Sequence, residues 1–266
     1  MNGPILKIFA GGLILGLLGL SILPASLAAS PAETLLEDLR YEVDVWVWRK
    51  AVQARISLRK VGEGRYLAEI SGEALGLARV LSGQRRDNHQ TEMVYRNGRL
   101  APVVYREESR RRGRRHFKEY RFLYDQGRLE LWQWDDHQQQ LFRKWETPLQ
   151  EPMYDPISAF YNYRLGLMGP VKAGDILRVQ GIPHPQREII EVRLGPEGEE
   201  GKEAMVSLVN RAFEDEKGVV FVTFDKDLVP TRAWSRVLVF GKIIGRLQSG
   251  SKSVKPPLDL AAFDDY

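Results

Sequence analysis

The apolar residues along this chain follow two different periods. Over most of its length, apolar and polar residues alternate with a period of two, which is typical of β-strands that bury one face of a sheet. One stretch, Glu151–Pro170, repeats its apolar residues at helical spacing instead. The sequence therefore predicts a protein built mainly from strands, with one well-defined helix between two groups of strands.

The helical stretch carries signals at both ends. Asp155 is a good N-cap residue, and Pro156 suits the first helical position, where a missing N–H is no loss. Gly169 and Pro170 predict the end of the helix. One face of this helix is mostly apolar and aromatic, and we expect it to lie on a sheet. Its residues are Ile157, Phe160, Tyr161, Arg164, Leu165 and Met168.

The strands before the helix are expected to form a series of hairpins. Asn97-Gly98 is the clearest turn, since both residues tolerate a positive φ. The range Leu75–Ser82 is apolar but broken by glycine, so it fits a bulged strand or a short helix, and we expect a strand. Alternation begins with Tyr41, Val43, Val45 and Val47, and the further expected strands are Val52–Leu58, Arg65–Ile70, Thr91–Tyr95, Leu100–Arg106, His116–Tyr124, Arg128–Trp134 and Gln140–Glu146.

A second group of strands follows the helix. Their expected ranges are Ile176–Ile182, Arg187–Leu194, Ala204–Phe213, Val219–Phe224, Thr231–Phe240 and Lys242–Leu247. About a dozen strands with short connections predict a mostly β protein with one large antiparallel sheet. Because sheets twist, we expect this one to curve into a half-barrel or an incompletely closed barrel, with the helix packed across its concave side.

The N-terminus has the features of a secretory signal peptide. A basic residue, Lys7, precedes an uncharged run, and the small residues of a cleavage site follow. The uncharged run approaches the roughly 20 residues that span a bilayer, so an uncleaved anchor in the inner membrane is the alternative. We expect a signal peptide at 1–28, a linker at 29–38, a single β-rich domain at 39–248 and a tail at 249–266. The domain would then lie in the periplasm.

Composition and motifs narrow the possible chemistry. The chain has no cysteine, which excludes disulfides, thiolate metal sites and cysteine nucleophiles, and its formal charge is only +4. Neither a nucleophile elbow nor a phosphate-binding loop is present. Asp135-Asp136-His137 and Asp225-Lys226-Asp227 each bring two carboxylates together, and such stretches are typical of hairpin tips. The histidines, none of which has zinc-site spacing, are His89, His116, His137 and His184. We therefore expect no catalytic residue, cofactor or metal.

Two clusters suggest binding. The first is a basic hairpin tip that could pair with phosphates or acidic glycans, and its residues are Arg110, Arg111, Arg112, Arg114 and Arg115. The alternative is a solvated tip that prevents edge pairing. The second could line an apolar cavity for an acyl chain, and its residues are Ile157, Phe160, Tyr161, Tyr120, Phe122, Tyr124, Trp132 and Trp134. The alternative is an ordinary core beneath the helix.

Three segments resemble a known family. Residues 40–43 with 51–58 look like its opening strand pair, residues 155–164 (Asp-Pro-Ile-Ser-Ala-Phe-Tyr-Asn-Tyr-Arg) are similar to its most recognisable segment, and residues 225–232 resemble its late turn and strand. The family is domain-of-unknown-function family 3108, which groups exported, mostly Gram-negative proteins. Ala54 stands where this family often has glycine. The resemblance implies an envelope location and a β-rich fold, with no established activity.

These observations together predict a non-catalytic binding or carrier module in the periplasm. Its ligand would be a lipid or another amphipathic, anionic envelope molecule, with the tail under the helix and the head near the arginine tip. The alternatives are an assembly protein that docks on an envelope protein partner and, less favoured, an enzyme acting on cell-wall glycan, which needs two convergent carboxylates. Export argues against nucleic acid as a partner, and we expect membrane association at most through the N-terminus.

Overall fold

Within the residues that the structure describes, one sheet of 15 strands contains most of the regular structure. The computed structural model describes residues 33–150, 152–182, 188–198, 201–207, 219–237 and 241–254. The strands before the main helix are β1 Thr34–Val45, β2 Trp48–Gly62, β3 Arg65–Ala74, β4 Arg86–Arg96, β5 Arg99–Arg111, β6 Arg114–Leu123, β7 Arg128–Asp135 and β8 Gln140–Pro148. The later strands are β9 Met153–Tyr154, β10 Ile176–Gly181, β11 Glu188–Gly198, β12 Gly201–Ser207, β13 Val219–Phe224, β14 Pro230–Val237 and β15 Gly241–Leu247.

The strand order in the sheet shows how the two groups of strands are joined. The order is β8-β7-β6-β5-β4-β3-β2-β1-β15-β14-β13-β12-β11-β10-β9, so β1 and β15 connect two meanders. Neighbours are antiparallel except for β9 and β10, which are parallel. The two edge strands, β8 and β9, do not pair, although they follow one another in the chain. The predicted architecture, an incompletely closed, mostly β sheet with one main helix, is confirmed.

The helix α2, Pro156–Arg164, begins as the sequence indicates. The Asp155 carboxylate accepts hydrogen bonds from the backbone N–H groups of Ile157 (2.8 Å) and Ser158 (3.1 Å), and the Ser158 hydroxyl accepts one from the Asp155 N–H. This is a complete capping box. The helix ends at Arg164, earlier than predicted, because Gly166 takes a left-handed φ of 75° and closes the terminus.

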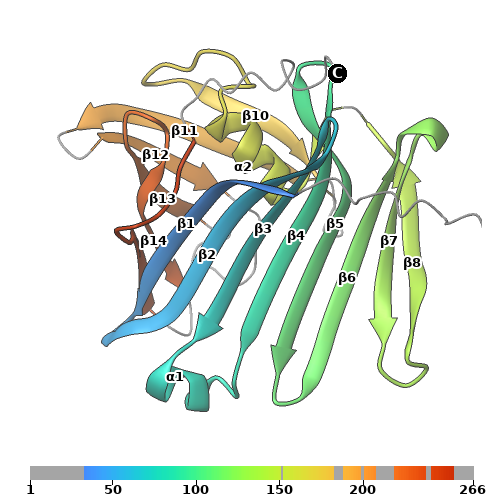
Figure 1. Ribbon diagram of the computed structural model, residues 1–266, viewed down its shortest axis with the longest axis horizontal. Helices are drawn as coiled ribbons and strands as arrows, with labels where there is room; N and C mark the ends of the chain where they lie inside the picture. The colour runs from blue at the N-terminus through green and yellow to red at the C-terminus, as the bar shows by residue number, and fades with distance from the viewer. Residues whose placement is uncertain are drawn as a thin grey trace, which may run out of the picture. The chain divides into compact units, whose positions relative to one another are not determined.

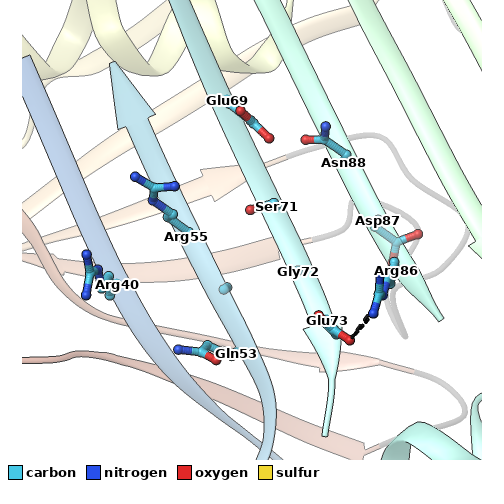
Figure 2. Close-up of a pocket in the computed structure, with 11 residues that line it drawn as sticks. Arg40, Gln53, Arg55, Glu69, Ser71, Gly72, Glu73, Arg86, Asp87 and Asn88 are labelled. Atoms are coloured by element: carbon cyan, nitrogen blue, oxygen red, sulfur yellow. Dashed lines mark hydrogen bonds and ion pairs between the residues drawn. The ribbon is translucent and has the colours of Figure 1, made fainter. Parts of the chain in front are cut away.

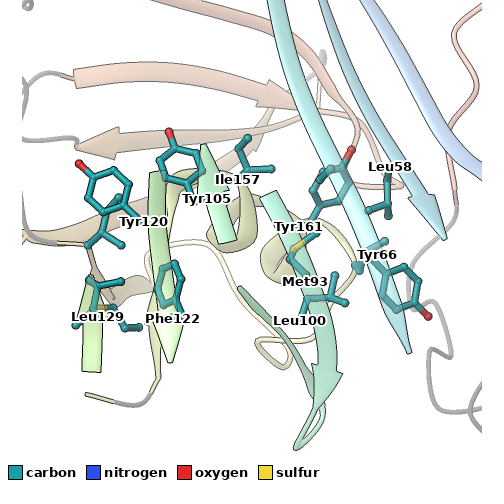
Figure 3. Close-up of a cluster of buried hydrophobic side chains, with 14 of the residues drawn as sticks. Leu58, Tyr66, Met93, Leu100, Tyr105, Tyr120, Phe122, Leu129, Ile157 and Tyr161 are labelled. Carbon is teal, nitrogen blue, oxygen red and sulfur yellow. The ribbon is translucent and has the colours of Figure 1, made fainter. Parts of the chain in front are cut away.

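The helix α2 is buried on both sides, whereas the sequence predicted one apolar face. Seven of its nine residues are buried. Ile157 and Tyr161 belong to the largest core cluster with residues of β2–β7 (Figure 3). Tyr163 packs against Phe224 of β13, and Ala159 packs near Ile190 of β11. The helix therefore lies between the two groups of strands, as Figure 1 shows, and it forms the centre of the core.

A buried arginine ties the end of α2 to distant parts of the chain. Arg164 and Glu37 of β1 are both 0% exposed, and Nη2 of Arg164 lies 2.8 Å from Oε1 of Glu37. The same guanidinium donates hydrogen bonds to the carbonyl oxygens of Asp227 (2.5 Å) and Val254 (2.7 Å). Burial raises the pKa of the Glu37 carboxyl, although the charge of Arg164 opposes that shift. Four segments thus meet at one charged group.

Two further sequence-based expectations were wrong. Leu75–Ser82 was expected as a strand, but Gly76–Leu81 forms the helix α1. Its first residue, Gly76, has a positive φ of 50°, and Gly83, just beyond its end, has a positive φ of 71°. Residues 34–38 were expected in a linker but belong to β1, because their backbone pairs with β2 and, at Asp38, with Lys252 of the expected tail. The predicted signal peptide, 1–28, parts of three predicted strands, 187, 208–213 and 238–240, and residues 255–266 of the predicted tail lie outside the described residues.

The outer face of the sheet, opposite α2, carries rows of paired charges. Glu119 of β6 is buried between Arg106 and Arg121, and each arginine Nε donates a 2.7 Å hydrogen bond to its carboxylate. Burial by itself raises the pKa of Glu119, but the hydrogen bonds and charges of the two arginines outweigh burial. The pKa of Glu119 therefore lies below its ordinary value of 4.5.

The buried arginine gives the first testable prediction. We expect Arg164→Met to lower the free energy of unfolding by about 3–5 kcal/mol, because Glu37 would remain buried without its partner. Arg178→Met is the matched control, since it breaks an exposed pair with Glu191 and should cost less than about 1 kcal/mol. Urea unfolding measures both. Equal, small losses in the two variants would contradict a central role for Arg164.

Glu119 gives a prediction about pH. A carboxyl whose pKa is lower in the folded protein than in the unfolded chain stabilises the fold fully at pH values above the pKa of the unfolded chain. This stabilisation is lost as the pH falls from there through the pKa of the folded protein. We expect the free energy of unfolding of the wild type to fall below pH 4.5, and Glu119→Gln to make that decline shallower. Glu63→Gln, in the exposed β2–β3 turn, controls for the loss of one carboxylate. An unchanged slope in Glu119→Gln would refute the assignment.

Candidate functional site

The structure separates the aromatic residues predicted to line a ligand cavity. Figure 3 shows that the inner members of the set, Ile157, Tyr161, Tyr120 and Phe122, lie within one packed cluster of buried side chains. This is the arrangement of a core. Phe160 is half-buried and packs at the edge of the same cluster. The proposal that these residues hold an acyl chain would require the cluster to open.

The two predicted tryptophans lie on the outer face. Arg121 stacks over the Trp132 ring at 4.4 Å, and the Trp132 indole N–H donates a hydrogen bond to Glu130. Arg115 lies over the Trp134 ring at 5.4 Å. Neighbouring positions on a strand point to opposite faces, so these rings are on the side away from Leu129 and Leu131 of the core. They cannot line the same cavity as Tyr120.

A cleft lies where β9, β10 and β11 face the β4–β5 turn and the start of β5, and we call it the seam cleft. It consists of two adjoining hollows of about 530 and 240 Å³ that share Arg99, Pro152 and Tyr154. The larger hollow is further lined by Met168, Leu177, Arg178, Val179, Gln180 and Ile189. The smaller one is further lined by Arg96, Asn97, Ala101, Pro102, Tyr124 and Met153. Tyr124 is the one predicted ligand-binding residue that lines it.

The local sequence explains why the sheet does not close between β8 and β9, next to this cleft. β8 ends at Pro148, and Pro152 precedes β9, so two residues without a backbone N–H flank the connection between the edge strands. β9 has only two residues, and both pair with β10. The start of β5 lies beside β9 instead, where Nη1 of Arg99 donates a hydrogen bond to the Tyr154 hydroxyl (3.2 Å). The cleft opens at this junction.

The lining of the seam cleft is amphipathic and cationic. Arg96, Arg99 and Arg178 contribute positive charge, and no carboxylate is among the described residues that line either hollow. Arg178 pairs with Glu191 outside the cleft, and Arg96 stacks over Tyr124 at 5.0 Å. Arg99 is exposed and pairs with no carboxylate of the described chain. Its guanidinium is therefore available to an anion.

Apolar side chains form the other part of the seam cleft. Met168 and Leu177 are half-buried and pack near Tyr163 of α2, while Ile189 is exposed. Sequence reasoning missed these residues and Arg99. Two features of the sequence could have indicated this site. One is the pair of prolines, Pro148 and Pro152, where the alternating strand pattern stops, and the other is a basic residue, Arg99, directly after the Asn97-Gly98 turn.

The predicted anion site lies at the other end of the sheet. All five arginines belong to the β5–β6 hairpin end, and Arg110 and Arg115 pair with Glu108. Arg99 and Arg111 stand at opposite ends of β5, about 40 Å apart at the rise of a strand. The structure therefore does not bring the arginine tip near α2, and one small ligand cannot contact both.

A second hollow, of about 460 Å³, lies on the outer face of β1–β4 (Figure 2). Small Ser71 lies among long charged side chains there, and these already pair with one another or with neighbouring carboxylates. Examples are Arg86 with Glu73 (2.8 Å) and Arg55 with Asp38 (2.5 Å). This hollow has the character of a solvated sheet face, so it is a weaker candidate than the seam cleft.

The remaining candidates in the described part of the chain are a metal site, histidine contacts and a membrane-spanning helix. It contains no group of three or more histidine, aspartate or glutamate residues placed to hold a metal ion. His89 accepts or donates a hydrogen bond with the Tyr105 hydroxyl at 2.9 Å. Within the same residues, no helix has both the length and the apolar character needed to cross a membrane.

Comparison with known proteins places the chain in a family. No curated protein and no solved structure matches it. One family model does, and it spans residues 40–244, which contain the opening strand pair, α2 and the β13–β14 turn. That model covers most of the chain and agrees with the resemblance seen in the sequence. The chain belongs to the family described as protein of unknown function, DUF3108.

Proposed function

We propose that this protein is a non-catalytic binding or carrier module for an amphipathic, anionic molecule of the cell envelope. The single observation that supports this most strongly is the seam cleft, in which unpaired Arg99 lies beside apolar side chains. Its larger hollow, about 530 Å³, has the size typical of small-molecule sites. The location in the periplasm rests on the signal-peptide features of the N-terminus.

The chemistry of the lining indicates how such a molecule would lie. A carboxylate or phosphate can accept charge-assisted hydrogen bonds from the Arg99 guanidinium, which is the strong class of hydrogen bond. The aliphatic chain would then follow Met168, Leu177 and Ile189 along β10 and β11. The Tyr154 hydroxyl, which already accepts a hydrogen bond from Arg99, fixes the guanidinium at the mouth of the hollow. This position differs from the one expected beneath α2, where the core is packed.

A pair of soluble probes tests this proposal. A fluorescent fatty acid and the fatty alcohol of the same length are titrated into mature protein purified without detergent. We expect Arg99→Gln to weaken binding of the acid about tenfold or more, since a hydrogen bond to a charged group is lost, and to leave the alcohol almost unaffected. Ile189→Glu should weaken both probes, because it places a charge where the chain lies.

Control variants distinguish a specific binding site from non-specific binding of the probes. Arg65→Gln removes an exposed arginine from the β2–β3 end and should bind both probes like the wild type. Unfolding curves confirm that each variant is folded. Wild-type protein that binds neither probe, or variants that all bind equally well, would overturn the proposal. Organic extraction followed by native mass spectrometry of protein from an envelope-containing host then identifies the natural molecule.

A further inference from the structure

The short helix α1 exposes its apolar side chains. Leu77, Val80 and Leu81 are 62%, 72% and 53% exposed, and no residue of α1 is buried. Its backbone is nevertheless held in place, because the Leu75 N–H donates a hydrogen bond to the Ala51 carbonyl of β2. Exposed aliphatic side chains gathered on one fixed turn indicate an interaction surface, whereas scattered ones need no explanation.

The arginine tip of the β5–β6 hairpin is attached directly to α1. The Arg112 backbone N–H donates a hydrogen bond to the Gly83 carbonyl (2.8 Å), and Nε of Arg111 donates one to the Ser82 carbonyl (3.1 Å). Figure 1 shows α1 and the β5–β6 turn at the same end of the sheet. The basic and the apolar residues therefore form one continuous surface, which we call the rim. Its residues are Leu77, Arg79, Val80, Leu81, Arg111, Arg112 and Arg114.

Most of the charge on the rim is not neutralised. Within the described chain, Arg79, Arg111, Arg112 and Arg114 form no ion pair with a carboxylate, and all four are exposed. The acidic residues near the rim are already paired. They form the pairs Glu108 with Arg110 and Arg115, Glu73 with Arg86, and Asp87 with Arg85. The rim therefore carries a local positive excess that the overall charge of +4 hides.

The next turn along the same end extends the apolar part. In an antiparallel meander, alternate connections lie at one end, so the β1–β2 turn is on the same side as α1 and the arginine tip. This turn exposes Trp46 and Val47, and the Trp46 N–H is fixed by the Lys242 carbonyl. Tryptophan is enriched where protein meets the boundary of a bilayer.

We propose that the rim docks on the surface of an anionic lipid bilayer. Leu77, Val80 and Leu81 would enter the boundary between head groups and acyl chains, while the unpaired arginines contact lipid phosphates, as in interfacial helices. The rim is a protruding helical turn beside a hairpin tip, and its three aliphatic side chains fall well short of the roughly 800 Å² that each partner buries in a standard protein interface. A soft, negatively charged surface fits it better than a folded partner.

This inference goes beyond the proposed function and does not depend on it. The rim and the seam cleft lie at opposite ends of β5, so either can fail alone. It also differs from the expectation that the membrane is reached only through the N-terminus, because mature protein without residues 1–28 would still bind vesicles. A protein that docks by the rim would present its seam cleft away from the bilayer surface.

The test is vesicle co-sedimentation with mature protein. We expect at least tenfold tighter binding to vesicles of phosphatidylglycerol and phosphatidylethanolamine than to phosphatidylcholine alone, and weaker binding at high salt. Arg112→Glu with Arg114→Glu, and separately Val80→Glu with Leu81→Glu, should each lose at least tenfold. The matched control is Arg65→Glu with Lys226→Glu, which makes the same charge change at the other end of the sheet and should stay within about twofold of the wild type.

A local probe reports insertion. Because the chain has no cysteine, Val80→Cys can carry a single environment-sensitive dye, and its emission should shift to the blue on anionic vesicles. The same dye on Arg65→Cys should not shift. If the control variant Arg65→Glu with Lys226→Glu lost as much vesicle binding as the rim variants, the binding would be non-specific electrostatic attraction. If the dye at position 80 did not shift, the rim would not insert. Either result overturns the proposal. So would a wild type that ignores vesicles, which would point to a protein partner for the rim.

Discussion

The fold depends on one buried charged pair. Arg164 and Glu37 are both fully buried, and the arginine also binds the carbonyl oxygens of Asp227 and Val254. Removing one partner of such a pair leaves the other buried and uncompensated, so the contacts of Arg164 favour the arrangement in which these four segments come together. The constraint fixes α2 against the first strand, the β13–β14 turn and the end of the described chain. The sheet curves around this helix, as Figure 1 shows.

That curvature bears on where the proposed ligand would bind. Because α2 is buried on both sides, the space inside the curved sheet near it is occupied by core. The cleft lies instead beside the edge strand β9, where Arg99 meets Tyr154. The structural core and the candidate site are thus adjacent but distinct. Residues such as Met168 and Leu177 belong to both, since they pack beneath α2 and line the cleft.

Local signals predicted much of the fold. The N-cap at Asp155 and the Asn97-Gly98 turn were predicted correctly because their chemistry involves residues close in sequence. The range Leu75–Ser82 was wrongly predicted as a strand. It forms a short helix with a positive-φ glycine at its start and another just beyond its end, and none of the helix's residues is buried to give an apolar pattern. The sequence predicted one buried face for α2, but the helix is buried on both sides. Periodicity shows which residues of a helix share a face, and it does not show how many strands surround the helix.

The candidate site was harder to predict because it arises from long-range geometry. Neither Arg99 nor Tyr154 is conspicuous in the sequence, and they meet only because the sheet curves until β9 reaches β5. The tryptophans at 132 and 134 were grouped with Tyr120 by residue type, whereas strand alternation places them on the outer face. The basic tip was recognised from its composition, but its attachment to α1 needed the structure.

The measurement that tests the central claim most directly is photo-crosslinking with a fatty acid that carries a diazirine along its chain, followed by peptide mapping. If the seam cleft is the binding site, the cross-links will concentrate in residues 152–154 and 168–179, and excess unlabelled fatty acid will remove them. Cross-links within residues 157–161, the helix segment beneath which the sequence placed the ligand, would contradict the account. So would labelling spread evenly over the surface.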